Sequence, residues 1–369
     1  MNSICALISR DDALDVLLAG VEIIPISQQP VDEAVGRISA GLIASSPLPA
    51  KSIAVTDGWA VRALDLVGAS SYSPALLMMR PSWVESGEFL PDECDTVIES
   101  AWLDQKDDIF QIVSEPRPGE GTRPVGAEVA ADFVVLSPGQ KVRAIHSLIA
   151  TKLGLESLSV RTPRLQIINV SGGGDQSFTA QYIAEAAARA GAVVTRMDVA
   201  KTTTAIASAM VATEAHLIVT IGGTGSGKTD VTIDSLRSID IPVAHGIAIT
   251  PGRTAAVGRK GDTPIIALPG DLEGALGTWL AVGLPLLDRL TSRERPIELR
   301  PIRRKISSAV GVAEVVLLAS QAGEWLPLAV GELPLWALSQ ADAWMLVPAD
   351  GEGFPAGELC QAYRFGDEK

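Results

Sequence analysis

The chain has 369 residues, of which 47% are hydrophobic and 20% charged, and its net charge is −14. This length exceeds one typical hydrophobic core and predicts roughly two to four domains of an ordinary folded protein. The acidic balance argues against a general nucleic-acid binder, which needs a basic face. The most apolar helical run, Gly274 to Leu287, is too short to span a membrane and contains Pro285, so we expect no membrane association.

Cysteine and histidine usage points away from a disulfide scaffold or a zinc protein. The three cysteines are far apart, and the N-terminus lacks the apolar stretch of a signal peptide, so a reducing cytoplasm is the expected location. No spacing of His146, His216 and His245 supports a catalytic triad or metal ligation. We therefore interpret these histidines as packing or surface residues.

The first part of the chain changes character twice. Apolar positions at helical intervals between Asp11 and Leu42 predict helical structure there. Between residues 47 and 132, short apolar runs broken by proline, glycine and aspartate predict a small β-rich domain. A turn at Ser137 precedes a predicted helix over residues 144–154.

From Arg164 onward, predicted strands alternate with predicted helices. Strands are expected at residues 165–170, 192–199, 216–220, 241–249 and 263–268, and helices at 179–191, 203–214 and from 271 to about 290. This alternation is typical of a parallel sheet with helices on both faces, whose ligands bind beyond the carboxyl ends of the strands. After Arg295, short strands such as residues 312–319 predict a C-terminal β domain.

Three loops follow predicted strands at the edge where a ligand is expected. They are Ser171–Asp175, Gly222–Asp230 and Pro269–Gly274. Glycine allows sharp turns and lets main-chain N–H groups approach an anion, so all three are candidate anion-binding loops.

The segment Gly222 to Thr229 also matches the phosphate-binding P-loop pattern G-x-x-x-x-G-K-[ST]. A P-loop opens directly into a helix, whereas the residues after Lys228 include the β-branched Thr229, Val231, Thr232 and Ile233, which start helices poorly. No later strand ends in a convincing magnesium-binding aspartate. A nucleotide-dependent phosphotransferase is therefore the less favoured interpretation.

Seven segments, in order, resemble the molybdopterin molybdenumtransferase family, which includes MoeA and the gephyrin E domain. Each motif alone is weak, but their shared order is strong evidence of homology. The segments are TDGWAVRALDL (56–66), VESGEFLPDECDTVI (84–98), RPVGAEV (123–129), TPRLQIINVSGGGD (162–175), IGGTGSGKTD (221–230), TPGRTAAVGR (250–259) and ALPGDLEGAL (267–276).

The resemblance implies a multidomain α/β protein that forms a homodimer. The expected domains are an elongated linking domain (1–42 and 133–162), a small β-rich insertion domain (43–132), a central parallel-sheet α/β domain of the molybdopterin-binding type (163–293) and a C-terminal β domain (294–369). The implied reaction hydrolyses adenylylated molybdopterin with Mg²⁺ while molybdate is inserted at the dithiolene. A molybdoenzyme that accepts the finished cofactor is a further expected partner.

Candidate site residues follow from the matched motifs. Asp57, Ser86, Glu128 and Asp230 are the predicted catalytic residues, and the three carboxylates are also predicted magnesium ligands, since hard oxygen ligands suit this ion. Loop residues are predicted to bind the pterin phosphate: Gly172, Gly173, Gly222, Gly223, Thr224, Gly225, Ser226, Lys228, Pro251, Gly252, Arg253, Pro269, Gly270 and Asp271. We expect Arg253, Arg259 and Lys260 to supply local positive charge.

The chain departs from the family pattern at several charged positions. Gly173 and Gly174 replace an acidic position, Thr250 replaces a lysine, and Asp271 stands where the family has asparagine. Lys228 adds a positive charge to the glycine loop, where it is either a phosphate contact or a solvated side chain. Lost carboxylates weaken a magnesium site, so a non-catalytic paralogue that binds or carries molybdopterin is the alternative to a divergent enzyme.

Overall fold

The computed structural model describes residues 7–77, 80–106, 109–171, 176–212 and 214–366. The chain divides into two compact units. We call Met1–Ala40, Pro138–Arg143 and Ser157–Lys369 the core unit, and Gly41–Ser137 with Ala144–Glu156 the insertion unit. Each unit is described by itself below.

A six-stranded sheet forms the centre of the core unit. Its order is β15 (Val193–Ala200), β14 (Arg164–Ser171), β16 (Leu217–Ile221), β20 (Thr263–Leu268), β19 (Ala256–Lys260) and β17 (Val243–His245). The first four strands are parallel, which confirms the predicted α/β sheet, whereas β19, next to the edge strand, pairs antiparallel with both β20 and β17. The single strand predicted over residues 241–249 is wrong, because Gly246 with a φ of 92° ends β17 and residue 249 already belongs to a strand of another sheet.

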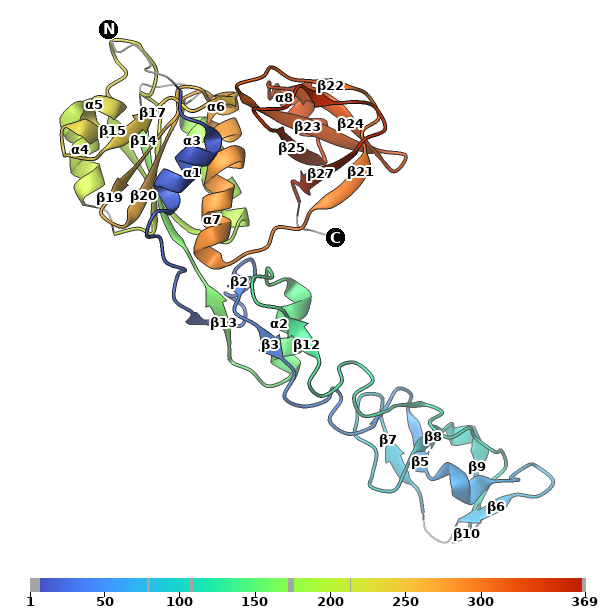
Figure 1. Ribbon diagram of the computed structural model, residues 1–369. Helices are drawn as coiled ribbons and strands as arrows, with labels where there is room; N and C mark the ends of the chain where they lie inside the picture. The colour runs from blue at the N-terminus through green and yellow to red at the C-terminus, as the bar shows by residue number, and fades with distance from the viewer. Residues whose placement is uncertain (1–6, 78–79, 107–108, 172–175, 213, 367–369) are drawn as a thin grey trace. The chain divides into compact units, whose positions relative to one another are not determined.

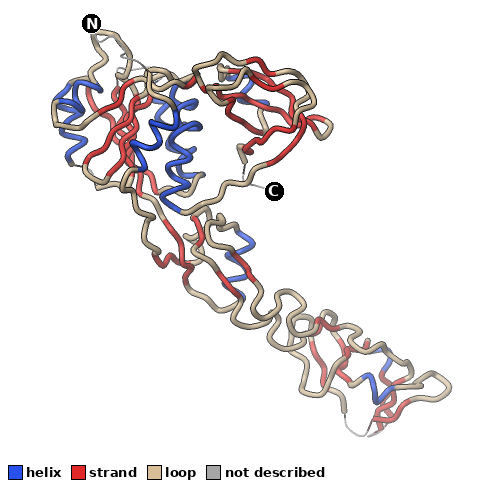
Figure 2. Tube along the Cα trace, in the orientation of Figure 1, coloured by secondary structure: helices blue, strands red, loops and turns tan. Residues whose placement is uncertain are grey.

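Helices cover both faces of this sheet (Figures 1 and 2). Successive strand residues point to opposite faces, so Ile167, Val219 and Ile266 join one core cluster and their neighbours Ile168, Ile218 and Ile265 join the other. The first cluster is covered by α1 (Arg10–Leu18), α3 (Gln176–Arg189), α6 (Leu272–Thr278) and α7 (Leu284–Thr291). The second is covered by α4 (Thr203–Val211) and α5 (Thr232–Arg237).

The predicted helix from residue 271 to about 290 is confirmed as one continuous helical segment. A π-helical turn, η3 (Trp279–Gly283), joins α6 to α7. Pro285 has no N–H to donate, and the carbonyl of Ala281, four residues before it, accepts from Nε of Arg10 at 2.9 Å instead. A Cβ on Gly283 would come within 2.3 Å of Cε3 of Trp279. Glycine at this position therefore lets the large indole ring be buried against the helix.

The helical prediction for Asp11 to Leu42 holds only for its first part. Helix α1 ends at Leu18, and the chain then forms β1 (Ser27–Pro30), turns, β2 (Ile38–Ser39) and, in the insertion unit, β3 (Leu42–Ile43). Gly36 and Gly41 have φ angles of 87° and 117°, which a right-handed helix cannot contain. The apolar residues at helical spacing are buried by strand pairing instead, with β1 and β2 flanking β13 (Ser157–Arg161).

The last part of the core unit is a β domain, as predicted. Its main sheet has the order β18 (Ile249–Thr250), β23 (Ala313–Gln321), β25 (Ala343–Val347), β27 (Leu359–Arg364) and β21 (Glu298–Pro301), with β24 (Glu324–Val330) paired to β23. A two-stranded ladder, β22 (Ile306–Ser307) and β26 (Gly353–Phe354), and helix α8 (Leu335–Gln340) complete it. Strand β18 comes from the α/β part of the chain, and its pairing with β23 is parallel.

The insertion unit is built from short strands and small helices, as the interrupted apolar runs predict. One three-stranded sheet has the order β7 (Ser82–Val84), β5 (Gly58–Val61) and β8 (Thr96–Ile98), and another has the order β6 (Ala75–Leu77), β10 (Ile109–Ile112) and β9 (Leu103–Lys106). Two further sheets have two strands each: β11 (Thr122–Arg123) pairs with β4 (Ile53–Ala54), and β12 (Val134–Leu136) pairs with β3. Its helices are η1 (Ala63–Leu66), η2 (Ser100–Trp102) and α2 (Ala144–Lys152).

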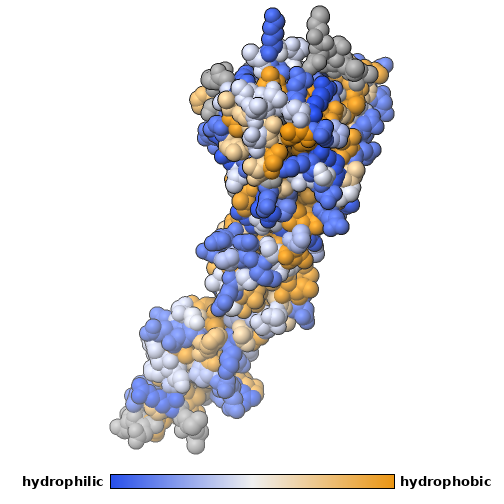
Figure 3. Space-filling model, turned by 90° about the vertical axis from the view of Figure 1, so that its left-hand side faces the viewer, coloured by the Kyte–Doolittle hydropathy of each residue, from blue (hydrophilic) through white to orange (hydrophobic). Residues whose placement is uncertain are grey.

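Several large apolar side chains lie on the surface, and Figure 3 shows hydrophobic patches among hydrophilic ones on the face that it presents. In the insertion unit, Ile43 and Val134 are cross-strand partners and are 60% and 53% exposed. Phe133 beside them and Ile145 and Leu148 on one face of α2 are exposed as well. We call the exposed cross-strand pair Ile43 and Val134 the apolar patch. Within the part of the chain that the structure describes, no helix is long and apolar enough to cross a membrane.

Candidate functional site

A cavity of about 940 Å³ lies where parallel strands β16 and β20 of the core unit end. This is the edge at which open α/β sheets bind ligands. Its walls come from the glycine loop after β16, the loop after β20, the first turns of α3 and two residues of the C-terminal β domain. They are Phe178, Thr179, Gly223, Thr224, Gly225, Asp230, Thr254, Pro269, Gly270, Asp271, Leu272, Glu273, Leu333 and Leu335.

The glycine loop presents main-chain amides at this cavity. Of the three amides expected from the sequence, two have no partner among the described residues. The N–H of Gly222 donates to the carbonyl of Leu268 at 3.0 Å, so this amide already has a main-chain partner. The N–H groups of Gly223 and Gly225 make no hydrogen bond to another described residue. Gly223 has a φ of 72°, and a Cβ there would meet Oγ1 of Thr232 at 2.5 Å. Only glycine fits this turn.

Asp230 closes the same loop. Its Oδ2 accepts a hydrogen bond of 2.9 Å from the N–H of Gly227. A Cβ on Gly225 or Gly227 would come within 2.7 and 2.8 Å of that oxygen. The two glycines thus let the loop wrap around the carboxylate, which lines the cavity. Ser226 and Lys228 are exposed and are not among the lining residues.

The P-loop interpretation is not supported by this geometry. The helix after the loop, α5, begins only at Thr232 and has six residues, and no side chain caps it. Lys228 lies in the turn before it rather than at a helix N-terminus. A P-loop needs its phosphates to face the first amides of a helix that opens from the loop, and this arrangement is missing here.

Asp271 caps the long helix at the opposite wall. Its Oδ2 accepts a hydrogen bond of 2.7 Å from the N–H of Gly274, and its carbonyl accepts from Ala275. Pro269, Gly270 and Asp271 all line the cavity, as expected from their place after β20. The carboxylate that replaces the family's asparagine therefore has a structural role, because either side chain can accept the capping bond.

The loop at residues 251–253 supports the cavity more than it lines it. Gly252 has a φ of 126° and packs so closely on α6 that a Cβ would meet Oγ1 of Thr278 at 2.4 Å. Arg253 is exposed, whereas the next residue, Thr254, reaches the cavity with its hydroxyl 3.4 Å from that of Thr224. Thr254 is a lining residue that the sequence reasoning missed, because only the fold shows which side of the loop faces inward.

The expected concentration of positive charge at the cavity is wrong. Lys260 donates to the carbonyls of Met210 and Val211 at the end of α4, and Arg259 bonds to the carbonyls of Leu17 and Gly261. Both cations thus bond to carbonyl groups at helix ends elsewhere in the core unit. Among the described residues, those lining the cavity include Asp230, Asp271 and Glu273 but no lysine or arginine.

His245 touches the glycine loop from the neighbouring edge strand β17. Its Nε2 lies 2.9 Å from the carbonyl oxygen of Thr224. A carbonyl oxygen can only accept, so this nitrogen carries the proton. The interpretation of His245 as a packing or surface residue missed this contact, which connects two segments 21 residues apart in the chain.

The other predicted catalytic residues belong to the insertion unit. The carboxylate of Asp57 accepts a hydrogen bond of 2.8 Å from the N–H of Ser86, whose hydroxyl donates to the carbonyl of Val55 at 3.2 Å. Glu128 pairs with Lys152 at 2.9 Å and with Arg123. Hydrogen bonds from Lys152 and Arg123 lower the pKa of Glu128 below its ordinary value. Asp57 and Ser86 are thus brought together, and Glu128 is held by cations.

The predicted magnesium ligands do not form a metal centre within either unit. Asp230 lies in the core unit, whereas Asp57 and Glu128 lie in the insertion unit. Among the described residues, no group of three histidine, cysteine, aspartate or glutamate side chains is arranged to hold a metal ion. Asp230 and Asp271 each accept a main-chain N–H, and Glu128 is neutralised. The donor set therefore does not fit a magnesium site made of protein carboxylates alone. Gly172 and Gly173 lie outside the described residues.

Comparison with known proteins places this cavity in context. Residues 8–154 match the family model described as "MoeA N-terminal region (domain I and II)", and residues 174–289 match "Probable molybdopterin binding domain". Molybdopterin molybdenumtransferase 2 of Mycobacterium tuberculosis is 30% identical over 305 residues, 69% of this chain and 75% of that protein. The chain belongs to the molybdopterin molybdenumtransferase family.

Other members of the family align with most of this chain. A molybdopterin molybdenumtransferase of Haemophilus influenzae is 24% identical over 299 residues, 72% of this chain and 73% of that one. The solved MoeA protein of Pyrococcus horikosii has 20% identity and a TM-score of 0.71 over 98% of this chain and 100% of its own, which shows the same fold. The cavity lies within the segment that matches the molybdopterin-binding model, apart from Leu333 and Leu335.

Proposed function

We propose that this protein inserts molybdate into adenylylated molybdopterin and hydrolyses the adenylyl group, as a step in molybdenum cofactor biosynthesis. Membership of the molybdopterin molybdenumtransferase family supports a transferase of this pathway. The observation that carries the proposal is the cavity at the ends of β16 and β20, with main-chain amides that have no described partner. Its volume of about 940 Å³ suits a pterin with its phosphate.

In this proposal the loops bind and orient the substrate. The amides of Gly223 and Gly225 donate to the pterin phosphate, and the hydroxyls of Thr224 and Thr254 supply further hydrogen bonds. In the hydrolysis, water forms a bond to the adenylyl phosphorus, the phosphoanhydride bond to the pterin phosphate breaks, and AMP leaves. Asp57, Ser86, Glu128 and Asp230 remain the proposed catalytic residues, and no step is assigned to a magnesium ion.

Several broader features of the family enter the same proposal. We also propose four domains with the boundaries expected from the sequence, and the family model for domains I and II over residues 8–154 supports an N-terminal pair. The chain works in the cytoplasm as a homodimer, with the apolar patch of the insertion unit buried against a second copy. It passes the finished cofactor to a molybdoenzyme. Dependence on magnesium stays a prediction.

A turnover assay with adenylylated molybdopterin and molybdate tests the reaction. The expected products are AMP and a cofactor that reconstitutes an apo-molybdoenzyme. Thr254→Val removes a lining hydroxyl with little change in shape and should lower kcat/KM about tenfold, the effect of one hydrogen bond to a charged group. Thr204→Val, at an exposed position of α4, is the matched control. Tight pterin binding without AMP release would show that the protein is a carrier of molybdopterin and not an enzyme.

A further inference from the structure

A second, smaller cavity of the core unit is bounded by basic side chains. It measures about 230 Å³ and lies between α3, the α6–η3–α7 helix and the end of the C-terminal β domain. Five cations line it: Lys141, Arg189, Arg293, Arg295 and Arg364. We call this space the basic cavity. It shares no lining residue with the cavity of the proposed reaction.

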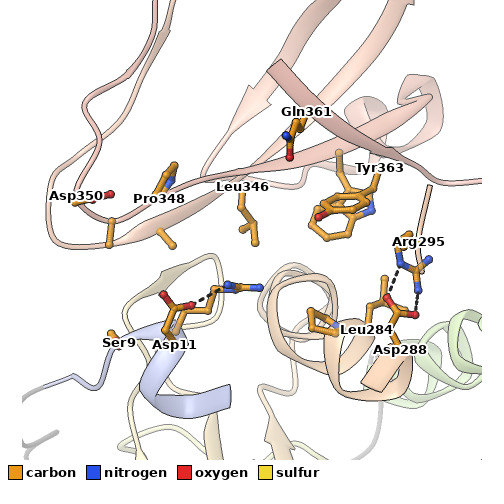
Figure 4. A pocket seen from close by; sticks show the side chains of 15 residues that line it. Ser9, Asp11, Leu284, Asp288, Arg295, Leu346, Pro348, Asp350, Gln361 and Tyr363 are labelled. Carbon is orange, nitrogen blue, oxygen red and sulfur yellow. Dashed lines mark hydrogen bonds and ion pairs between the residues drawn. The ribbon is translucent and has the colours of Figure 1, made fainter. Parts of the chain in front are cut away.

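The charge of the basic cavity is unusual for this chain, whose net charge is −14. Among the described residues, no aspartate or glutamate lines it. Two of the arginines have carboxylate partners behind them: Arg295 pairs with Asp288 at 2.8 Å, as Figure 4 shows, and Arg364 pairs with Glu298 at 2.6 Å. Arg189 has no ion-pair partner in the described part of the chain. Five cations that converge on a space lined by no described carboxylate favour an anion.

The remaining lining is aromatic and apolar. Tyr182, Trp279, Trp344 and Phe365 contribute ring surface, and Leu276, Leu280 and Leu284 fill the gaps between them. Trp279 is 1% exposed, yet its Nε1 has no hydrogen-bond partner among the described residues. The six-membered ring of the Trp279 indole packs on Gly283, and its Nε1 lies on the other side of the indole. A buried N–H without an acceptor is costly, and a ligand oxygen would satisfy it.

Helix capping explains part of this arrangement but not all of it. Arg189 is in the last turn of α3, where a cation complements the helix dipole. This effect does not account for the convergence of Lys141, Arg295 and Arg364 from three other segments, nor for the unused indole donor of Trp279. The combination is typical of a pocket that recognises a charged group together with a flat ring.

We propose that the basic cavity binds a small organic anion, in which one phosphate group is joined to a planar ring. Arg189 and Arg293 face the phosphate as charged donors, Trp279 supplies its indole N–H, and Tyr182 and Trp344 contact the ring. The volume of about 230 Å³ limits the ligand to roughly one ring and one phosphate. The occupant would join the α/β part and the C-terminal β domain of the core unit, so binding stabilises the native state.

Calorimetric titration of the full-length protein with phenyl phosphate tests the proposal. Saturable one-to-one binding is expected, and Arg189→Gln should weaken it about tenfold, the effect of losing one charge-assisted hydrogen bond. Arg237→Gln is the matched control, because Arg237 is likewise exposed in the last helical turn, of α5, but does not line the cavity. Inorganic phosphate should bind more weakly than phenyl phosphate, since it lacks the ring.

A spectroscopic readout locates the ligand independently of affinity. The indole ¹H–¹⁵N resonance of Trp279 should move to lower field with phenyl phosphate, as its N–H gains an acceptor, and the shift should saturate with the calorimetric curve. Equal affinities of Arg189→Gln and Arg237→Gln, or an unmoved Trp279 resonance, would overturn the proposal. Neither measurement involves molybdopterin turnover, so failure here leaves the proposed function untouched, and the reverse also holds.

Discussion

The contact of His245 Nε2 with the carbonyl of Thr224, at 2.9 Å, holds the glycine loop at the rim of the main cavity. We predict that His245→Ala raises KM about three- to tenfold with a smaller effect on kcat, since the loop binds substrate and one positioning hydrogen bond is lost. Steady-state assays of AMP release would measure this. His245→Gln retains an N–H donor at similar reach and should rescue KM. If the alanine and glutamine variants behaved alike, the hydrogen bond would have no positioning role.

Two substitutions of Asp271 can distinguish its effect as a helix cap from the effect of its negative charge. Asp271→Ala should lower the free energy of unfolding by about 1 kcal/mol, because the N–H of Gly274 loses its acceptor. Asp271→Asn restores the family's residue and keeps an acceptor, so its stability should stay near that of the parent protein. Urea unfolding of both variants measures the difference. A similar loss of stability in the asparagine variant would show that the charge, not the cap, stabilises the helix.

Glu128 gives the insertion unit a pH-dependent contribution to stability. Lys152 and Arg123 lower the pKa of its carboxyl group from the ordinary 4.5. A lowered pKa in the folded state stabilises the protein above the unfolded pKa, and this contribution is lost as pH falls through the folded value. The Tm difference between the parent protein and Glu128→Gln should therefore be constant above about pH 5 and shrink at lower pH. A difference that grew on acidification would contradict this sign.

The sequence predicted the position of the cavity better than the roles of individual groups in it. Asp230 and the Pro269–Asp271 turn line the cavity because residues that follow parallel strands meet at one edge of the sheet. It did not anticipate that the amide of Gly222 pairs with Leu268, or that Arg259 and Lys260 bond to carbonyls at helix ends. His245 and Thr254 were missed because their contacts join segments distant in sequence, and no local pattern records them.

The turn at Gly252 is packed tightly against helix α6. Gly252→Ala should destabilise the protein by about 1–3 kcal/mol, because the residue has a φ of 126° and a Cβ would meet Thr278. Gly261→Ala is the matched control, with a positive φ of 57° but no atom within 4 Å of its Cβ. Thermal unfolding of the two variants measures the part that is due to crowding. Equal losses would show that backbone strain alone matters.

Element prediction succeeded where one physical signal dominated. Buried runs such as Leu217–Ile221 are strands because both faces of the sheet are covered by helices. The helical pattern between Val31 and Leu42 failed because glycines with positive φ interrupt it and strand pairing buries the same residues. Strand β19 was not predicted, since its residues were interpreted only as a motif.

At the scale of the whole molecule, assembly is the feature to test first. The apolar patch predicts a dimer, so Ile43→Glu should shift the mass measured by light scattering toward a monomer, because a charge would be buried against apolar side chains. Leu359→Glu is the control, at a position 65% exposed in the C-terminal β domain, against 60% for Ile43. A parent protein of monomeric mass, or dimers in both variants, would refute this role of the patch.

Strand β18 has a consequence for engineering this fold. Ile249 and Thr250 pair in register with Ala313 and Glu314 of β23, two residues before the turn at Gly252. A piece of chain from the middle of the α/β region is therefore a strand of the sheet in the C-terminal β domain. Chimeras that exchange the C-terminal β domain between relatives must carry residues 247–252 with it, and a cut placed only at Arg295 would leave β23 without its edge partner.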